Sequence, residues 1–218
     1  MIIAIDGPAG SGKSTLGRML ARALKLLYID TGSMYRAVAL ATIDAALDPS
    51  NADAVTELAQ RVEINLEGDP DSLRVWLEGR DVTERIREDD ITDLSSIVST
   101  IPGVRRAMVA RQREIGKRGA VMNGRDIGTV VFPDADIKFF LDAVPEERAE
   151  RRFKEDVLVN RDATLAQTLA EITERDYRDS TRADSPLKIS DGAIVIDSTG
   201  LSIQDVFERM MDHVHRNH

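Results

Sequence analysis

A glycine-rich segment near the amino terminus holds the residues best suited to chemistry. Residues 7–14 read GPAGSGKS and match the pattern G-x-x-x-x-G-K-[ST]. Glycines let successive backbone N–H groups point inward around a phosphate, and a helix that begins there adds the positive end of its dipole. In such a loop, Lys13 would bridge the β- and γ-phosphates and the Ser14 hydroxyl would bind Mg²⁺. The segment predicts a nucleoside triphosphate site; the alternative is a strand-to-helix turn that binds nothing.

The residues around this segment have the pattern of a strand followed by a helix. An apolar run at residues 2–5 precedes it, and apolar residues recur between positions 16 and 24 at the spacing of one buried helical stripe. A phosphate-binding loop needs this setting, because the strand anchors the loop and the new helix points its amino terminus at the phosphate.

The rest of the chain alternates short apolar runs with helical stripes. Runs that predict strands lie at residues 2–5, 26–29, 120–122, 137–141 and 193–196, and further helical stripes lie around residues 35–46, 104–115, 165–172 and 203–211. Strands that alternate with helices form mostly parallel sheets that helices cover on both faces. The sequence therefore predicts an α/β P-loop fold with a five-stranded parallel sheet.

One stretch, at about residues 62–82, breaks this rhythm. Apolar and polar residues alternate from Val62 to Leu66, the turn sequence GDPD follows, and alternation resumes from Leu73 to Leu77. This pattern predicts a small antiparallel hairpin carried on the main domain. A second departure is a highly charged helix at residues 146–155.

Composition narrows the class of protein. The chain has 218 residues, no cysteine and a net charge of −9, and arginine outnumbers lysine among its 29 basic residues. A net negative charge argues against a surface that binds duplex nucleic acid, and no apolar run approaches the length of a membrane span. The opening residues do not have the pattern of a signal peptide. We expect a cytoplasmic monomer that binds small molecules, with its positive charge gathered in a pocket.

Other P-loop classes lack support in the sequence. A GTPase would carry an Asn-Lys-x-Asp segment to read guanine, and a motor-type ATPase usually has an apolar strand that ends in Asp-Glu; the chain has neither. A compact kinase is favoured. A kinase for another small acceptor and a non-catalytic nucleotide-binding switch stay open as alternatives.

Four further segments carry a resemblance to a known family. They are DTGSMYR at residues 30–36, GRDIGTVVFP at residues 124–133, RDYRD at residues 175–179 and IDST at residues 196–199. Together with the glycine-rich segment, and in this order, they resemble the bacterial-type cytidylate kinases, a branch of the nucleoside monophosphate kinases. The resemblance implies ATP-dependent phosphorylation of CMP and dCMP, with Mg²⁺, in pyrimidine metabolism.

The resemblance also implies three domains. The core would comprise residues 1–32, 103–147 and 164–218, the nucleoside monophosphate (NMP)-binding domain residues 33–102 with the hairpin, and the lid residues 148–163.

Individual roles follow from the same resemblance. Arg36 and Arg125, with Arg182, would hold the acceptor phosphate, and Lys13, Arg36 and Arg125 would be catalytic. Asp126, Ser96 and Arg105 would surround cytosine, while Arg175 and Asp179 would meet the ribose. The residues implied at CMP are Thr31, Tyr35, Arg36, Ser96, Arg105, Arg125, Asp126, Arg175, Asp179 and Arg182, and those implied at ATP are Gly7, Pro8, Ala9, Gly10, Ser11, Gly12, Lys13, Ser14, Thr15, Arg148 and Arg152.

An acceptor phosphate changes what the site must supply. It is mostly dianionic at neutral pH and needs no general base, so positioning and positive charge carry the reaction. The alternative for several of these arginines is an ordinary ion pair on a solvated helix, such as Arg175 with Asp179 or Arg152 with Glu155. The three histidines near the carboxyl end, His213, His215 and His218, are expected on a frayed surface, not at a metal.

Overall fold

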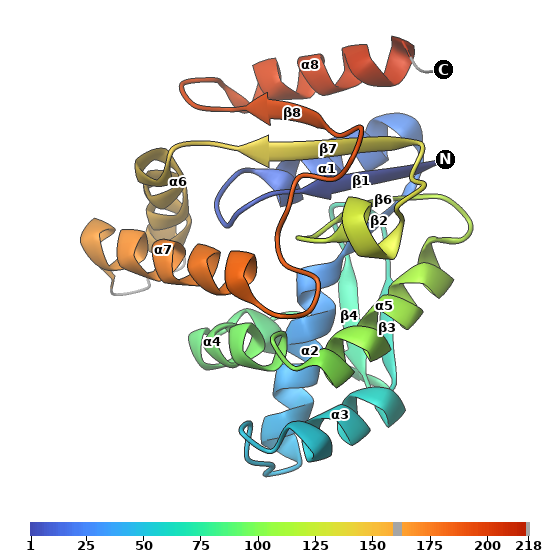
Figure 1. Ribbon diagram of the computed structural model, residues 1–218, viewed down its shortest axis with the longest axis vertical. Helices are drawn as coiled ribbons and strands as arrows, with labels where there is room; N and C mark the ends of the chain where they lie inside the picture. Colours follow the sequence, from blue (N-terminus) through green and yellow to red (C-terminus); the bar gives the residue numbers. More distant parts are fainter. Residues whose placement is uncertain (159–162, 217–218) are drawn as a thin grey trace.

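A five-stranded parallel sheet forms the centre of the protein, whose computed structural model describes residues 1–158 and 163–216 (Figure 1). Its strands are β1 (Ile2–Asp6), β2 (Leu27–Asp30), β6 (Ala120–Asn123), β7 (Ile137–Asp142) and β8 (Ile194–Asp197). They lie in the order β2-β6-β1-β7-β8, and all neighbouring pairs are parallel. The predicted α/β fold is confirmed, and all five predicted strands overlap observed ones.

Helices cover both faces of this sheet. On one face, α1 (Lys13–Leu24) and α8 (Ile203–Arg216) pack on Ile3 and Ile5 of β1 through Leu16, Leu20, Val206 and Met210. On the other face, Ala4 packs with Val109 of α5 (Pro102–Gly116) and with Ile127 of η2 (Ile127–Val131), a single π-helical turn. Successive residues of β1 thus enter opposite layers of the core, as the pleat of a strand requires.

The segment between β2 and α5 forms a second layer of structure. It contains α2 (Thr31–Asp44), α3 (Ala52–Arg61), β3 (Ile64–Glu67), β4 (Arg74–Leu77), β5 (Arg80–Asp81), η1 (Arg85–Arg87) and α4 (Asp89–Val98). The predicted antiparallel hairpin is present as β3 and β4, and β5 extends it to a three-stranded sheet in the order β3-β4-β5. The sequence analysis did not identify β5, because two residues are too few to show an alternating pattern.

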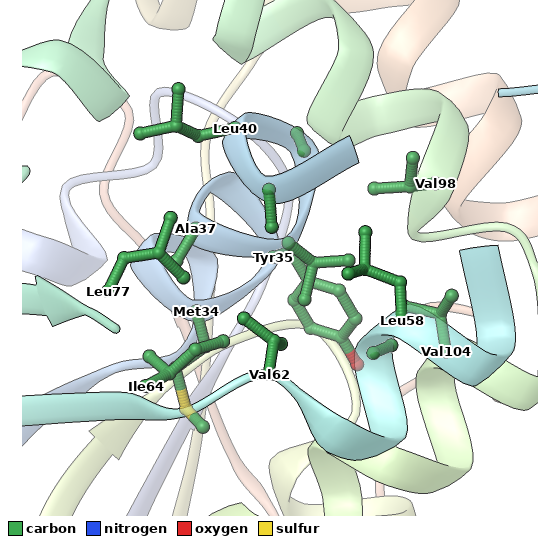
Figure 2. Close-up of a cluster of buried hydrophobic side chains, with 14 of the residues drawn as sticks. Met34, Tyr35, Ala37, Leu40, Leu58, Val62, Ile64, Leu77, Val98 and Val104 are labelled. Carbon is green, nitrogen blue, oxygen red and sulfur yellow. The ribbon is translucent and has the colours of Figure 1, made fainter. Parts of the chain in front are cut away.

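This segment has its own apolar cluster. Figure 2 shows residues of α2, including Met34, Ala37 and Leu40, beside Ile64 and Leu77 of the small sheet. The cluster also contains Val104 and Met108 of α5, a helix whose Val109 belongs to the core of the large sheet. Helix α5 therefore joins the two cores. The division of the chain into three domains stays a prediction.

Two helices project beside the carboxyl ends of the strands. They are α6 (Pro145–Leu158) and α7 (Leu165–Thr181), and they lie on the side to which the strand arrows point in Figure 1. Thr164 caps α7 by accepting a hydrogen bond from the Gln167 backbone N–H. Residues 159–162 of the predicted lid, and His218, lie outside the described residues. No helix in the described ranges is long and apolar enough to span a membrane.

Candidate nucleotide-binding site

The loop between β1 and α1 can be built only with glycine at two of its positions. Gly7 has φ 148°, and a Cβ atom there would lie 2.0 Å from the Leu141 carbonyl oxygen. Gly10 has φ 74°, and its Cβ would lie 2.7 Å from the carbonyl oxygen of Arg148 in α6. The loop thus packs tightly against both β7 and α6. It leads directly into the amino terminus of α1, the setting that a phosphate cradle requires.

Lys13 lies folded into this loop. Its Nζ donates to the Pro8 carbonyl oxygen at 2.5 Å and to Ser11 Oγ at 3.1 Å, and the residue is 6% exposed. Burial lowers the pKa of Lys13 well below its ordinary value, and the charges of Arg125 and Arg175 lower it further. The lysine therefore shares one electrostatic environment with arginines that come from distant segments.

Ser14 contacts the end of the neighbouring strand. Asn123, the last residue of β6, donates from Nδ2 to Ser14 Oγ at 3.1 Å. The Asn123 carbonyl oxygen accepts a hydrogen bond from Thr31 Oγ1 at 2.8 Å, and this contact joins β6 to the start of α2. Among the described residues there is no group of three or more His, Cys, Asp or Glu side chains that could hold a metal.

The tip of the loop is held by two helices. Arg148 of α6 donates from Nη1 to the Ala9 carbonyl oxygen at 2.9 Å and to Asp176 Oδ2 at 2.6 Å. The other oxygen of Asp176, in α7, accepts from the Ala9 backbone N–H at 3.2 Å. Arg148 is buried, and its Nε donates to the Ala143 carbonyl oxygen at 2.8 Å. The sequence analysis gave no role to Asp176, although it lies inside the RDYRD segment.

Arg152 has a different environment. It is partly exposed and pairs with Asp156 at 3.1 Å and Glu155 at 3.4 Å, both on its own helix. The pair with Glu155 is the local ion pair that was the alternative for this residue. Thr15, in the first turn of α1, is exposed.

Three arginines and one carboxylate meet next to the loop. Arg125 donates from Nε to Asp179 Oδ2 at 2.8 Å, and Arg182 donates from Nη1 to Asp179 Oδ1 at 3.3 Å. Burial raises the pKa of Asp179, but Arg125, Arg175 and Arg182 outweigh burial, so that the pKa lies below its ordinary value. Burial and the charge of Arg125 lower the pKa of Arg175 to about 10. Asp179 thus offsets part of a strongly positive cluster.

Arg36 lies at the start of α2. Its Nη2 donates to Asp30 Oδ2 at 3.1 Å, and Asp30 also caps the helix by accepting from the Gly32 backbone N–H. The charge of Arg36 contributes to the lowered pKa of Arg175, so it belongs to the same electropositive region.

A buried pair lies deeper, between α5 and the loop after β6. Arg105 donates from Nη2 to Asp126 Oδ2, and its Nη1 donates to the Ser99 carbonyl oxygen at 3.1 Å. The guanidinium carbon lies 5.4 Å from the ring centre of Tyr35, whose pKa burial raises to about 12. Arg182 approaches the second Asp126 oxygen at 3.9 Å. Ser96, in α4, is buried and lies one turn before Ser99, the residue that follows the helix.

The structure therefore brings most of the predicted residues into one region. Ion pairs link Arg105, Asp126, Arg182, Asp179 and Arg125 into one chain of contacts, although the residues come from three separate segments. The fold, the glycine-rich cradle and the adjoining arginine cluster are those of a P-loop kinase.

Comparison with known proteins identifies the family. The cytidylate kinase family model matches residues 3–216. The cytidylate kinase of Solibacter usitatus is 49% identical over 215 residues, which cover 97% of this chain and 90% of the relative. The cytidylate kinase of Caldanaerobacter subterraneus is 46% identical over 99% of this chain and 95% of the relative. The chain belongs to the cytidylate kinase family and is a nucleoside monophosphate kinase.

The fold is also found in a solved structure. An uncharacterized protein from Eubacterium ventriosum superposes with a TM-score of 0.56 and 13% sequence identity, over 99% of this chain and 98% of the other. At this identity the likeness concerns the fold alone.

Proposed function

We propose that this enzyme transfers the γ-phosphoryl group of ATP to the 5′-phosphate of CMP or dCMP. The arginine cluster beside the phosphate cradle carries the proposal. Two polyanions must be held in line, so the reaction needs fixed positive charge on both sides of the transferred group. Burial lowers the pKa values of Lys13 and Arg175, and the charge of Arg125 lowers both further, which supports the binding of an anion near these residues.

The acceptor phosphate would be held by Arg36, Arg125 and Arg182. Asp30 and Asp179 hold these guanidinium groups by ion pairs. The Asp179 carboxylate is a poor base, because the adjacent arginines outweigh burial and lower its pKa. This supports a phosphate acceptor over a hydroxyl acceptor, whose proton a free carboxylate would have to take.

The base and sugar of CMP would lie deeper. Asp126 would accept from the exocyclic amino group of cytosine, while Arg105 and Ser96 would donate to its ring nitrogen and carbonyl oxygen. Arg175 and Asp179 would meet the ribose, and Thr31 and Tyr35 would also contact CMP. The burial of Arg105 and Asp126 supports this arrangement, because hydrogen bonds select a base best where water is excluded.

ATP would bind the cradle formed by residues 7–15. Lys13 would stabilise the charge that develops on the transferred group, with Arg148 and Arg152 reaching its phosphates from α6. The Ser14 hydroxyl suits Mg²⁺, which binds kinases through one or two protein groups, substrate phosphates and water. Residues 33–102 would act as the NMP-binding domain and residues 148–163 as a lid over a core formed by the remaining residues.

The test is a comparison of acceptors. Initial rates of ADP release should be measured with ATP and each of CMP, dCMP, UMP, AMP and GMP, and with cytidine, which lacks the phosphate. We expect CMP and dCMP to give the highest kcat/KM and cytidine to be a negligible acceptor. Efficient phosphorylation of cytidine would indicate a kinase directed at a hydroxyl, and no ADP release with any acceptor would indicate a nucleotide-binding switch.

A further inference from the structure

Asp6 joins the strand before the phosphate cradle to the loop that carries two acceptor-site residues. It is the last residue of β1 and is 3% exposed. Its Oδ1 accepts from the Ile127 backbone N–H and its Oδ2 from the Gly128 backbone N–H, both at 2.8 Å. These two amides follow directly after Arg125 and Asp126 in the chain. Neither the sequence motifs nor the proposed chemistry uses Asp6.

The loop is bonded to β1 at both of its ends. The Gly124 backbone N–H donates to the Ile5 carbonyl oxygen at 3.0 Å, while Asp6 holds the amides of Ile127 and Gly128. Arg125 and Asp126 lie between these two anchors. Their side chains must therefore follow any shift of the backbone that Asp6 allows.

We infer that Asp6 is a positioning residue that sets the place of Arg125 and Asp126 in the acceptor site. This inference rests on the proposed function. Asp6 acts through the loop backbone and does not touch the nucleotide. The next residue, Gly7, begins the phosphate cradle. The end of β1 therefore fixes the cradle and the loop of residues 124–128 relative to each other.

The charge on Asp6 affects how firmly it holds the loop. Burial raises its pKa to about 6, and the Asp126 carboxylate raises it as well, while the two backbone hydrogen bonds and the charge of Lys13 lower it. Lys13 of α1 and Asp126 of the loop are the titratable groups that face it. When Asp6 takes up a proton, one oxygen becomes a donor that faces a backbone N–H. Its hold on the loop should then weaken as the pH falls below about 6.

Asp6→Asn tests this role, with Asp136→Asn as the matched control. An amide can accept from only one of the two backbone N–H groups, and its own N–H₂ then faces the other. Asp136 Oδ2 also accepts from a β1 backbone N–H, that of Ile2 at 2.6 Å, but at the opposite, exposed end of the strand. Asp6→Asn should raise the KM for CMP roughly tenfold with the KM for ATP unchanged. Asp136→Asn should change neither.

The pH profile separates positioning from a general loss of structure. CMP itself titrates with a second pKa of about 6, but this contribution is common to both enzymes and cancels in their ratio. The ratio of the CMP KM of Asp6→Asn to that of the wild type should be greatest well above pH 6 and approach one below it. A ratio that does not depend on pH, an unchanged CMP KM, or an equal rise in the KM for ATP would overturn the inference.

Thermal unfolding and calorimetry keep the test decisive even if the variant is unstable. If Asp6→Asn does not fold, as judged by thermal unfolding, calorimetry on the wild type replaces it. The Kd of CMP should then rise more steeply below pH 6 than the Kd of ADP, whose terminal phosphate titrates in the same range; parallel profiles would contradict the inference. Failure of the proposed function looks different, because wild-type enzyme would then not phosphorylate CMP at any pH.

Discussion

Arg105 and Asp126, the two residues predicted to read opposite edges of cytosine, form an ion pair with each other. Their side chains are 2% and 6% exposed, and Arg182 approaches the second oxygen of the same carboxylate. An ion pair buried to this degree is costly to break by removing one partner, because the other charge is left uncompensated. The proposed selection of the base and the stability of the fold would therefore depend on the same carboxylate.

Asp126→Asn should narrow the preference for CMP over UMP. In a pocket closed to water, the carboxylate faces the uracil carbonyl oxygen as one acceptor against another, whereas an amide can donate to that oxygen. Each mismatch of this kind costs about 1–3 kcal/mol, so the wild-type ratio of kcat/KM for CMP and UMP should be at least about tenfold and should fall in the variant. The variant should also unfold at a lower temperature, because Arg105 loses its charged partner.

Asp179→Asn is the matched control for this prediction. Asp179 contacts Arg182 as Asp126 does, but it lies on the ribose and phosphate side of the proposed site. Its replacement should raise the KM for CMP without changing the ratio of CMP to UMP. An unchanged ratio in Asp126→Asn would show that Asp126 does not read the base and serves the structure of the loop.

Lys13→Met should abolish most of the turnover with little loss of stability. In the proposed mechanism the lysine stabilises charge that develops during transfer, so kcat should fall by roughly 100-fold or more. Because burial lowers its pKa, the folded state gains little from the charge of Lys13, and an apolar side chain of similar length should be tolerated. Steady-state rates and thermal unfolding measure the two effects. Near-normal turnover would contradict the role of the cradle.

Arg125→Ala should weaken the use of CMP and leave ATP binding nearly unchanged. Asp179 keeps Arg182 as an ion-pair partner in this variant, so the cluster loses one cation without leaving the carboxylate unpaired. Charge-assisted contacts contribute about 1.5–3 kcal/mol, which corresponds to a roughly tenfold to hundredfold rise in the KM for CMP. Arg36→Ala should behave in the same way. A selective rise in the KM for ATP would instead indicate that these arginines belong to the ATP site.

Much of the fold could be predicted because its signals are local. The strand β1 and the stripe of α1 are visible as apolar periodicity, and the glycine-rich segment between them needs both. Helix α3 was missed although Asn51 caps it and Val55, Leu58 and Ala59 form its buried face. It is only ten residues long, and its buried residues span little more than one turn, so its apolar stripe is short. The π-helical turn after Asp126 has no signal in the sequence.

The contacts of the site could be predicted only where partners are close in sequence. Arg152 pairs with Glu155, three residues away, as its spacing suggested. Arg148, on the same helix, contacts Ala9 and Asp176, which lie 139 and 28 residues away. Such contacts depend on how parallel strands bring distant loops to one edge of the sheet. Asp6 illustrates the same limit, because a carboxylate at a strand end gives no sign of its partners.

Arg148→Ala should raise the KM for ATP with little effect on the KM for CMP. Arg148 and Asp176 hold the carbonyl and the N–H of Ala9, so removal of the guanidinium frees the tip of the phosphate cradle and leaves Asp176 without this cation. The control is Arg151→Ala on the same helix, because Arg151 contacts Glu147 and Ser198 and not the cradle. Equal KM values for ATP in the two variants would argue against a role for Arg148 in the ATP site.

The charge on Asp6 should make the stability of the protein depend on pH. The pKa of Asp6 is raised from 3.8 to about 6 by burial, so between these values the folded chain binds more protons than the unfolded chain. The contribution of Asp6 to the free energy of unfolding is therefore fully present below pH 3.8 and is lost as the pH rises through about 6. Asp6→Asn cannot titrate, and all other groups cancel in the comparison with the wild type. Denaturant unfolding of both proteins across this window, without nucleotide, should show the wild type losing stability relative to the variant as the pH rises. A constant difference would mean that the two backbone hydrogen bonds and Lys13 balance burial, and a wild type that gains stability with rising pH would mean that they outweigh it.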